Sequence, residues 1–109
     1  MIIQKEQKQN AVRLSASENG VEIGAMYLYL IKNDSHKKPY ALLEDLLVKE
    51  YHRKKGVGST LVKEAISEAR RLGCYKIIGT SRTSREEVHH FYEKLGMKKY
   101  GYEFRLDLA

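Results

Sequence analysis

The sequence predicts an α/β fold in which a mixed, largely antiparallel central sheet is flanked by helices. Two patterns support this expectation. Much of the first half of the chain alternates apolar with polar residues, which is the period of a half-buried strand. Much of the second half carries apolar residues three and four positions apart, which is the period of a helix. The expected order is three strands, a helix, a strand, a second helix and a closing strand.

Three strands are expected in the first half. Residues 11–17 alternate apolar and polar side chains, and Asn19-Gly20, a strong hairpin-turn signal, separates them from a second strand over residues 21–31. A polar loop follows, and residues 40–48 then predict a third strand that is rich in leucine. The first third of the chain is therefore expected to be an antiparallel hairpin.

The first expected helix follows the third strand. Apolar residues recur at helical spacing from Leu61 to Leu72, and Gly73 stands where a residue that ends a helix in the left-handed conformation belongs. Residues 75–80 then predict a short strand.

The second expected helix is bounded at both ends. Ser84 and Glu87 have the spacing of a capping box at its start, and Gly96 ends it. Residues 102–108 alternate again and predict a strand that closes the fold.

Length and composition narrow the class of protein. The 109 residues are expected to form a single domain over residues 1–109. No apolar run approaches the roughly 20 residues of a membrane-spanning helix, and the N-terminus becomes polar too early for a secretory signal. One cysteine, Cys74, cannot form an internal disulfide or a cysteine-based metal cluster. These features predict a cytoplasmic protein without a membrane partner.

The glycine-containing segment between the third strand and the first helix is a candidate anion site. It reads Arg53-Lys54-Lys55-Gly56-Val57-Gly58. Glycine lets backbone amides approach a ligand closely, a helix N-terminus adds amides without partners, and the three cations favour a phosphate. The string is not a P-loop, and Leu61 stands where a dinucleotide fingerprint needs its third glycine. The same glycines also suit a plain strand-to-helix turn.

The net charge of +6 does not by itself identify a partner. The basic residues are spread along the chain, and the sequence contains neither an aromatic-rich basic strand nor a zinc-finger spacing. We therefore do not expect nucleic-acid binding, because a basic cleft for a small polyanion gives the same charge.

Two motifs resemble those of the GNAT N-acetyltransferase superfamily. The run Glu44-Asp45-Leu46-Leu47-Val48, followed by Arg53-x-x-Gly56-x-Gly58-Ser59 and an amphipathic helix, resembles its acyl-CoA-binding motif. The run Phe91-Tyr92-Glu93-Lys94-Leu95-Gly96-Met97 is similar to its second hallmark, a helix that ends in F-Y-x-x-x-G-F. The motifs occur in the family's order and spacing, and the resemblance covers about residues 20–108.

The resemblance implies how acetyl-CoA is bound. The pyrophosphate is expected on the amides of residues 53–59, and the pantetheine arm on the backbone of residues 46–48, where the strand splays from its neighbour and leaves a V-shaped slot. An N–H near Leu47 or Val48 is expected to stabilise the oxyanion. Arg85 stands where many family members carry an asparagine that contacts CoA, so we expect it to reach a phosphate instead. The expected cofactor-binding residues are Leu46, Leu47, Val48, Arg53, Lys54, Lys55, Gly56, Val57, Gly58, Ser59 and Arg85.

The implied reaction moves an acetyl group from acetyl-CoA to a primary amine by direct attack in a ternary complex, without a metal. The amine must lose a proton, and Glu44 is the favoured base, with Asp45 expected to bind the substrate. Neighbours on a strand face opposite ways, so only one of the two acids is expected to reach the slot unless a bulge intervenes. Both acids also suit simple pairing with surface cations. Tyr92 matches the family's proton donor to the thiolate, although a core tyrosine would look the same.

The chain also departs from the family. Most members place two helices between their first two strands, but residues 1–20 show no helical stripe. Apolar surface left without that layer predicts a homodimer, in which a second subunit completes the acceptor side. The alternative function is a non-catalytic module that binds CoA, or nucleic acid through its basic face.

Overall fold

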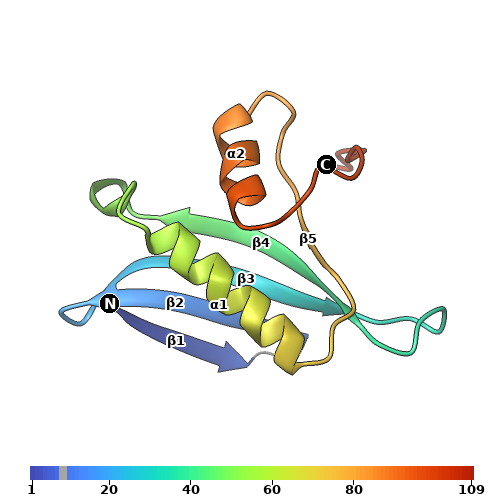
Figure 1. The fold of residues 1–109 in the computed structure, drawn as a ribbon, viewed down its shortest axis with the longest axis horizontal. Coiled ribbons are helices and arrows are strands. Elements are labelled where there is room, and N and C mark those ends of the chain that lie inside the picture. Colours follow the sequence, from blue (N-terminus) through green and yellow to red (C-terminus); the bar gives the residue numbers. More distant parts are fainter. Residues whose placement is uncertain (8–9) are drawn as a thin grey trace. The chain divides into compact units, whose positions relative to one another are not determined.

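A computed structural model, which describes residues 1–7 and 10–109, contains one five-stranded sheet and two α-helices (Figure 1). The chain divides into two compact units, Met1–Gly79 and Thr80–Ala109. The strands are β1 (Ile2–Gln7), β2 (Ala11–Glu18), β3 (Val21–Ile31), β4 (Tyr40–Val48) and β5 (Ile77–Gly79). The helices are a 3₁₀ turn, η1 (Glu50–His52), and the α-helices α1 (Val57–Arg71) and α2 (Glu86–Lys94).

The sheet belongs to the first unit, and its strands lie in chain order from β1 to β5. The first four strands are antiparallel neighbours, whereas β4 and β5 are parallel and are joined through α1. This crossover is the usual way in which a chain returns to a parallel neighbour. The predicted class, a mixed and largely antiparallel sheet with helices, is confirmed.

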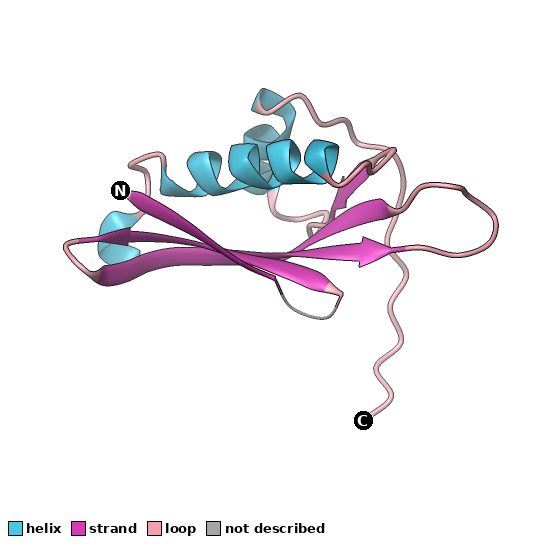
Figure 2. Ribbon diagram, turned by 90° about the horizontal axis from the view of Figure 1, so that it is seen from below, coloured by secondary structure: helices cyan, strands magenta, loops and turns pink. Residues whose placement is uncertain are grey.

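Helix α1 covers one face of this sheet (Figure 2). The apolar stripe predicted for it lies against the strands, and Leu61, Val62 and Ala65 have no exposed surface. Leu14 on β2 and Met26 on β3 are equally buried, and α1 contacts both of these strands. Burying a side chain of this size stabilises a fold by roughly 1.5–3 kcal/mol, so the α1 interface is the main core of the unit.

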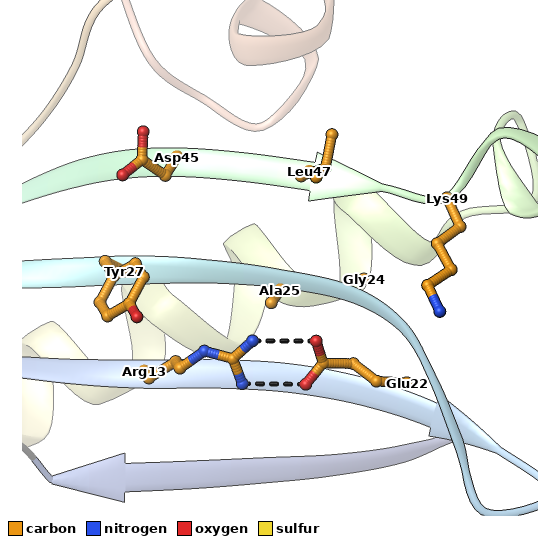
Figure 3. A pocket seen from close by; sticks show the side chains of 8 residues that line it. All are labelled: Arg13, Glu22, Gly24, Ala25, Tyr27, Asp45, Leu47 and Lys49. Carbon is orange, nitrogen blue, oxygen red and sulfur yellow. Dashed lines mark hydrogen bonds and ion pairs between the residues drawn. The ribbon is translucent and has the colours of Figure 1, made fainter.

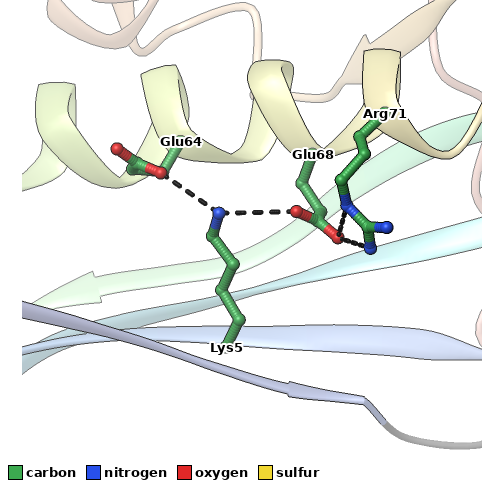
Figure 4. A network of polar contacts seen from close by, with 4 residues as sticks. All are labelled: Lys5, Glu64, Glu68 and Arg71. Atoms are coloured by element: carbon green, nitrogen blue, oxygen red, sulfur yellow. Dashed lines mark hydrogen bonds and ion pairs between the residues drawn. The ribbon is translucent and has the colours of Figure 1, made fainter.

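Strand β1 was not expected from the sequence, and ion pairs join it to α1. Lys5 Nζ lies 3.3 Å from a carboxylate oxygen of Glu64 and 3.4 Å from one of Glu68 (Figure 4). The guanidinium of Arg71 also donates to Glu68, whose side chain is buried. These hydrogen bonds, that from Arg71 first, hold the pKa of Glu68 below its ordinary value.

The pairing of β4 with β5 is short. It covers only Ala41, Leu42 and Leu43, although β4 continues to Val48. From Glu44 onward, β4 pairs only with β3 in the described part of the first unit. Over these residues, one backbone edge of β4 therefore has no strand neighbour in this unit, and the expected splay of the two strands stays a prediction.

Only residues 8–10 separate β1 from β2, which leaves no length of chain for the two helices that most family members carry at this point. The expectation that those helices are missing is confirmed. Among the described residues, none of the helices combines the length and the apolar character needed to cross a membrane.

Two expectations for the second unit are wrong. Residues 102–108 form no strand, because alternation shows which face of a strand would be apolar but supplies no partner for its backbone. Helix α2 begins at Glu86 without a side-chain cap, so Ser84 does not cap it. Glu87 instead accepts a hydrogen bond from Arg85, at 2.7 Å.

Candidate active site

The start of α1 has the form of an anion site. Gly56 adopts the left-handed conformation with φ of 83°, and its carbonyl accepts hydrogen bonds from the N–H and the hydroxyl of Thr60. The first amides of an α-helix have no acceptor within the helix, and no side chain caps this one. The N–H groups of Val57, Gly58 and Ser59 are therefore directed out of the helix end, where the helix dipole favours negative charge.

Three cationic side chains precede these amides. Arg53, Lys54 and Lys55 are all exposed in the turn between η1 and α1. Lys54 has a φ of 61°, a left-handed conformation that costs a side-chain-bearing residue roughly 1–2 kcal/mol. Strained backbone of this kind concentrates at functional sites. The predicted cations and amides thus meet in one short turn.

The end of β4 precedes this turn, with Lys49 and η1 between them. The amide of Lys49 donates to Ile23 O on β3, at 2.8 Å. Because successive amides along a strand point to opposite sides, the amide of Val48 points to the free edge of β4. The carbonyl of Val48 accepts a 2.9 Å hydrogen bond from Arg53 Nε, which joins this edge to the cationic turn.

A β-bulge separates the two candidate acids. Glu44 pairs with Tyr27 and Leu47 pairs with Ala25, so Asp45 and Leu46 together oppose Met26 alone. Asp45 has a φ of 54°, the left-handed conformation that opens one common type of bulge. Glu44 is half-buried, whereas Asp45 is exposed. Neither acid forms a salt bridge with a cation among the described residues.

Asp45 lines a cavity of about 200 Å³ on the first unit, and Glu44 does not (Figure 3). Arg13 donates two hydrogen bonds of 2.9 Å to the carboxylate of Glu22 in its wall. This pairing lowers the pKa of Glu22 and raises that of Arg13, so both groups stay charged near neutral pH. The lining residues are Arg13, Glu22, Gly24, Ala25, Tyr27, Asp45, Leu47 and Lys49.

Sequence reasoning missed most of this cavity. Alternation along the strands could place Arg13 and Tyr27 on the polar faces of β2 and β3, but it does not say that they are cross-strand neighbours. Their proximity depends on the register of three strands.

The remaining predicted residues, Arg85 and Tyr92, belong to the second unit. Tyr92 is half-buried on α2, with its ring centroid 5.4 Å from that of Phe91. Gly96 ends the helix as predicted, with a φ of 92°, and Met97 N–H donates to Tyr92 O. The guanidinium of Arg85 is engaged with Glu87, so an anionic ligand would compete for it.

Known proteins resemble this chain in sequence and in fold. A model of the acetyltransferase (GNAT) family matches residues 2–97. The glucosamine 6-phosphate N-acetyltransferase of Trypanosoma brucei brucei is 38% identical over 66 residues, which cover 61% of this chain and 43% of that protein. The uncharacterized N-acetyltransferase CgeE of Bacillus subtilis (strain 168) is 35% identical over 80 residues, which cover 73% of this chain and 29% of that protein.

Among solved structures, that of a Trypanosoma brucei acetyltransferase superimposes with a TM-score of 0.81 at 28% identity. The match covers 91% of this chain and 70% of that one. By contrast, the chain spans less than half the length of the two curated relatives.

Proposed function

Because the chain belongs to the acetyltransferase (GNAT) family, we propose that it is an acetyl-CoA-dependent N-acetyltransferase. It would move an acetyl group from acetyl-CoA to a primary amine by direct attack within a ternary complex. One observation carries the proposal: the uncapped start of α1 and its three cations follow, after η1, a strand whose outer edge has no strand neighbour beyond Leu43 in the described part of the first unit. We take residues 1–109 to act as one domain in this reaction.

The donor supplies an activated acetyl group as a thioester, and the chain supplies two kinds of contact for it. The amides of residues 56–59 and the cations at positions 53–55 suit the pyrophosphate. The free backbone edge of residues 46–48 suits the amide groups of the pantetheine arm, as a sheet edge suits an added strand. The amide of Val48 points to this edge, so we assign it, rather than that of Leu47, to the developing charge on the acetyl oxygen.

Proton transfer requires a base and an acid. The acceptor is an ammonium in water, and a carboxylate must take its proton before the nitrogen can attack. We keep Glu44 as the proposed base and Asp45 as the group that binds the amine, since Asp45 is the acid that lines the cavity. Tyr92 is proposed, on the family motif alone, to give its proton to the departing thiolate.

The experiment begins with calorimetry of acetyl-CoA binding. Lys54→Glu/Lys55→Glu should lower the affinity at least tenfold at low salt, because each reversal replaces an attraction of about 1 kcal/mol by a repulsion. Lys37→Glu/Lys38→Glu is the matched control. It makes the same change of charge in the exposed β3–β4 loop, at the other end of the sheet (Figure 1). No heat with acetyl-CoA, or equal losses in both variants, would overturn the donor site.

Turnover is measured next, as thiol release from acetyl-CoA with a panel of amines. Tyr92→Phe and Glu44→Gln should each slow release without weakening acetyl-CoA binding. Amino sugars belong in the panel, because the trypanosome relative is named for glucosamine 6-phosphate. Acetyl-CoA binding without turnover of any amine would instead favour the non-catalytic module.

A homodimer is also proposed. Four apolar side chains of the C-terminal segment, at alternate positions from Tyr102 to Leu108, are each at least 80% exposed. Exposed apolar surface of this kind marks an interface, and a second copy is the simplest partner. Light scattering should show a dimer at micromolar concentration, and Phe104→Ser/Leu106→Ser should weaken it. A stable wild-type monomer contradicts the proposal.

The cytoplasmic location stays a prediction.

A further inference from the structure

The cavity beside Asp45 carries opposite charges at its two ends. Asp45 lies in β4, and Lys49, four positions further along the chain, follows the last residue of that strand. The bulge at Asp45 makes this stretch shorter than the roughly 13 Å of a fully extended chain. Among the described residues, neither side chain forms a salt bridge. The charges of Arg13 and Glu22 cancel each other. The cavity is therefore left with one negative end, at Asp45, and one positive end, at Lys49.

Lys49 and Glu22 lie at the same end of the cavity, away from Asp45 (Figure 3). The Nζ of Lys49 is directed toward the side of the cavity that holds the Glu22 carboxylate. Lys49 also contributes, after Arg13, to the lowered pKa of Glu22. Two cations thus surround one carboxylate there, which leaves a net charge of about +1 at this end.

The space between the two ends is largely apolar. Ala25 and the ring of Tyr27 face it from β3, and Leu47, which is 65% exposed, faces it from β4. The volume of about 200 Å³ is smaller than the roughly 300–1,000 Å³ of pockets for drug-sized ligands. The cavity therefore suits a small metabolite that has charged groups at its ends and a less polar middle.

We propose that the acetyl acceptor is a small primary amine that also carries an anionic group, with its ammonium at Asp45 and its anion at Lys49. The inference rests on the proposed function, because it places the amine on the strand whose free edge would hold the thioester. A diamine fits poorly, since its second ammonium would meet Lys49. Phosphate and carboxylate share the required charge, and the test separates them.

The test compares acceptors that differ only in the anionic group. Glucosamine 6-phosphate is paired with glucosamine, 4-aminobutanoate with butylamine, and 1,4-diaminobutane supplies a second cation. Wild-type kcat/KM should be at least tenfold higher for the anionic member of one pair, and that pair identifies the anion. The diamine should be the poorest substrate.

Lys49→Gln should bring this ratio close to one, and Lys49→Glu should turn the preference toward the diamine. Lys63→Gln removes another exposed lysine, from α1, which covers the opposite face of the sheet, and should keep the wild-type ratio. The Kd for acetyl-CoA is measured for each variant, because Lys49 also lies close to the cationic turn in the chain.

Three results would overturn the inference while the proposed function stands. The wild type could prefer neutral amines or diamines, or Lys49→Gln could leave the ratio of kcat/KM values unaltered. The third result is that Lys49→Gln loses affinity for acetyl-CoA and keeps its acceptor preference. Calorimetry with the same acceptors gives an answer without turnover. Binding that requires both the anion and Lys49, in a chain that acetylates nothing, would support the site and refute the enzyme. No binding and no turnover of any anionic amine would refute both.

Discussion

Gly24 is the point at which β3 comes closest to the start of α1, and its replacement by alanine tests this packing. A Cβ atom at this position would lie 3.0 Å from Val57 Cγ1, 3.3 Å from Leu47 O and 3.3 Å from Leu61 Cδ1. All three distances are shorter than ordinary van der Waals contact. Val57 is β-branched and is held in one rotamer within a helix, and a strand carbonyl cannot rotate away. The backbone of α1 or β4 must therefore move.

The expected magnitude follows from two opposing effects. Forcing an extra methyl group into a packed core costs about 1–3 kcal/mol. Replacing glycine by alanine returns about 0.4–1 kcal/mol by restricting the unfolded chain. Gly24→Ala should therefore destabilise the protein by about 0.5–2 kcal/mol. For a chain of this length, each kcal/mol lowers Tm by about 4 °C, so Tm should fall by about 2–8 °C.

The assay is thermal and urea unfolding of a double-mutant cycle with Val57→Ala. Removal of Cγ1 relieves the shortest contact, so Gly24→Ala should cost at least 0.5 kcal/mol less in that background. Gly101→Ala is the matched control, because a Cβ there meets nothing within 4 Å. Val57 opens α1, so Gly24→Ala should also weaken acetyl-CoA binding. A Gly24→Ala protein as stable as the wild type, or an equal cost in both backgrounds, would refute the packing argument.

Three further predictions concern the same unit. Leu61→Ala should lower the free energy of unfolding by about 2–5 kcal/mol in urea titrations, because the side chain is fully buried. Gly56→Ala should cost about 1–2 kcal/mol through its left-handed φ alone, since a Cβ there meets nothing, and should lower acetyl-CoA affinity with it. Glu68→Gln should lower the free energy of unfolding by about 1 kcal/mol at pH 7. The expected loss is small because the partner Arg71 is largely exposed, so that water screens the ion pair. The folded-state pKa of Glu68 lies below the ordinary 4.5, so its stabilisation is complete above that pH and disappears as pH falls through the folded value. The Tm values of the wild type and of Glu68→Gln should therefore converge in acid, and a difference that persists there would contradict the ion-pair reasoning.

Periodicity predicted the elements that are buried on one side. Strands β2, β3 and β4 and helix α1 each place an apolar face in the core, and each has the expected pattern. Strand β1 escaped prediction because it lies at the edge of the sheet and carries polar residues on both faces. Residues 102–108 show the reverse case, because their alternation is regular and yet they form no strand. A strand forms only where its backbone pairs with another strand, and the apolar pattern does not supply that partner.

The register of β2 and β3 reflects a conflict between the hairpin turn and the apolar pattern of the two strands. The Asn19-Gly20 turn alone would place Arg13 opposite Met26, a polar residue opposite a core residue. A bulge near Ala16 shifts the register by one residue, so that Arg13 faces Tyr27 and the apolar residues face each other. The mismatch between turn and pattern is readable in the sequence, and it is the signal that could have located the polar face of the cavity.

The bulge in β4 resolves the same kind of conflict for the two acids. In a regular strand, one of two adjacent residues must face α1, and the unshifted register would place Asp45 opposite Met26, which has no exposed surface. A carboxylate buried there without a partner would cost several kcal/mol, whereas a left-handed aspartate costs roughly 1–2 kcal/mol. Aspartate also tolerates that conformation better than most residues. The strand therefore bulges at Asp45, the carboxylate reaches the cavity, and the strain is located where the proposed chemistry needs the charge.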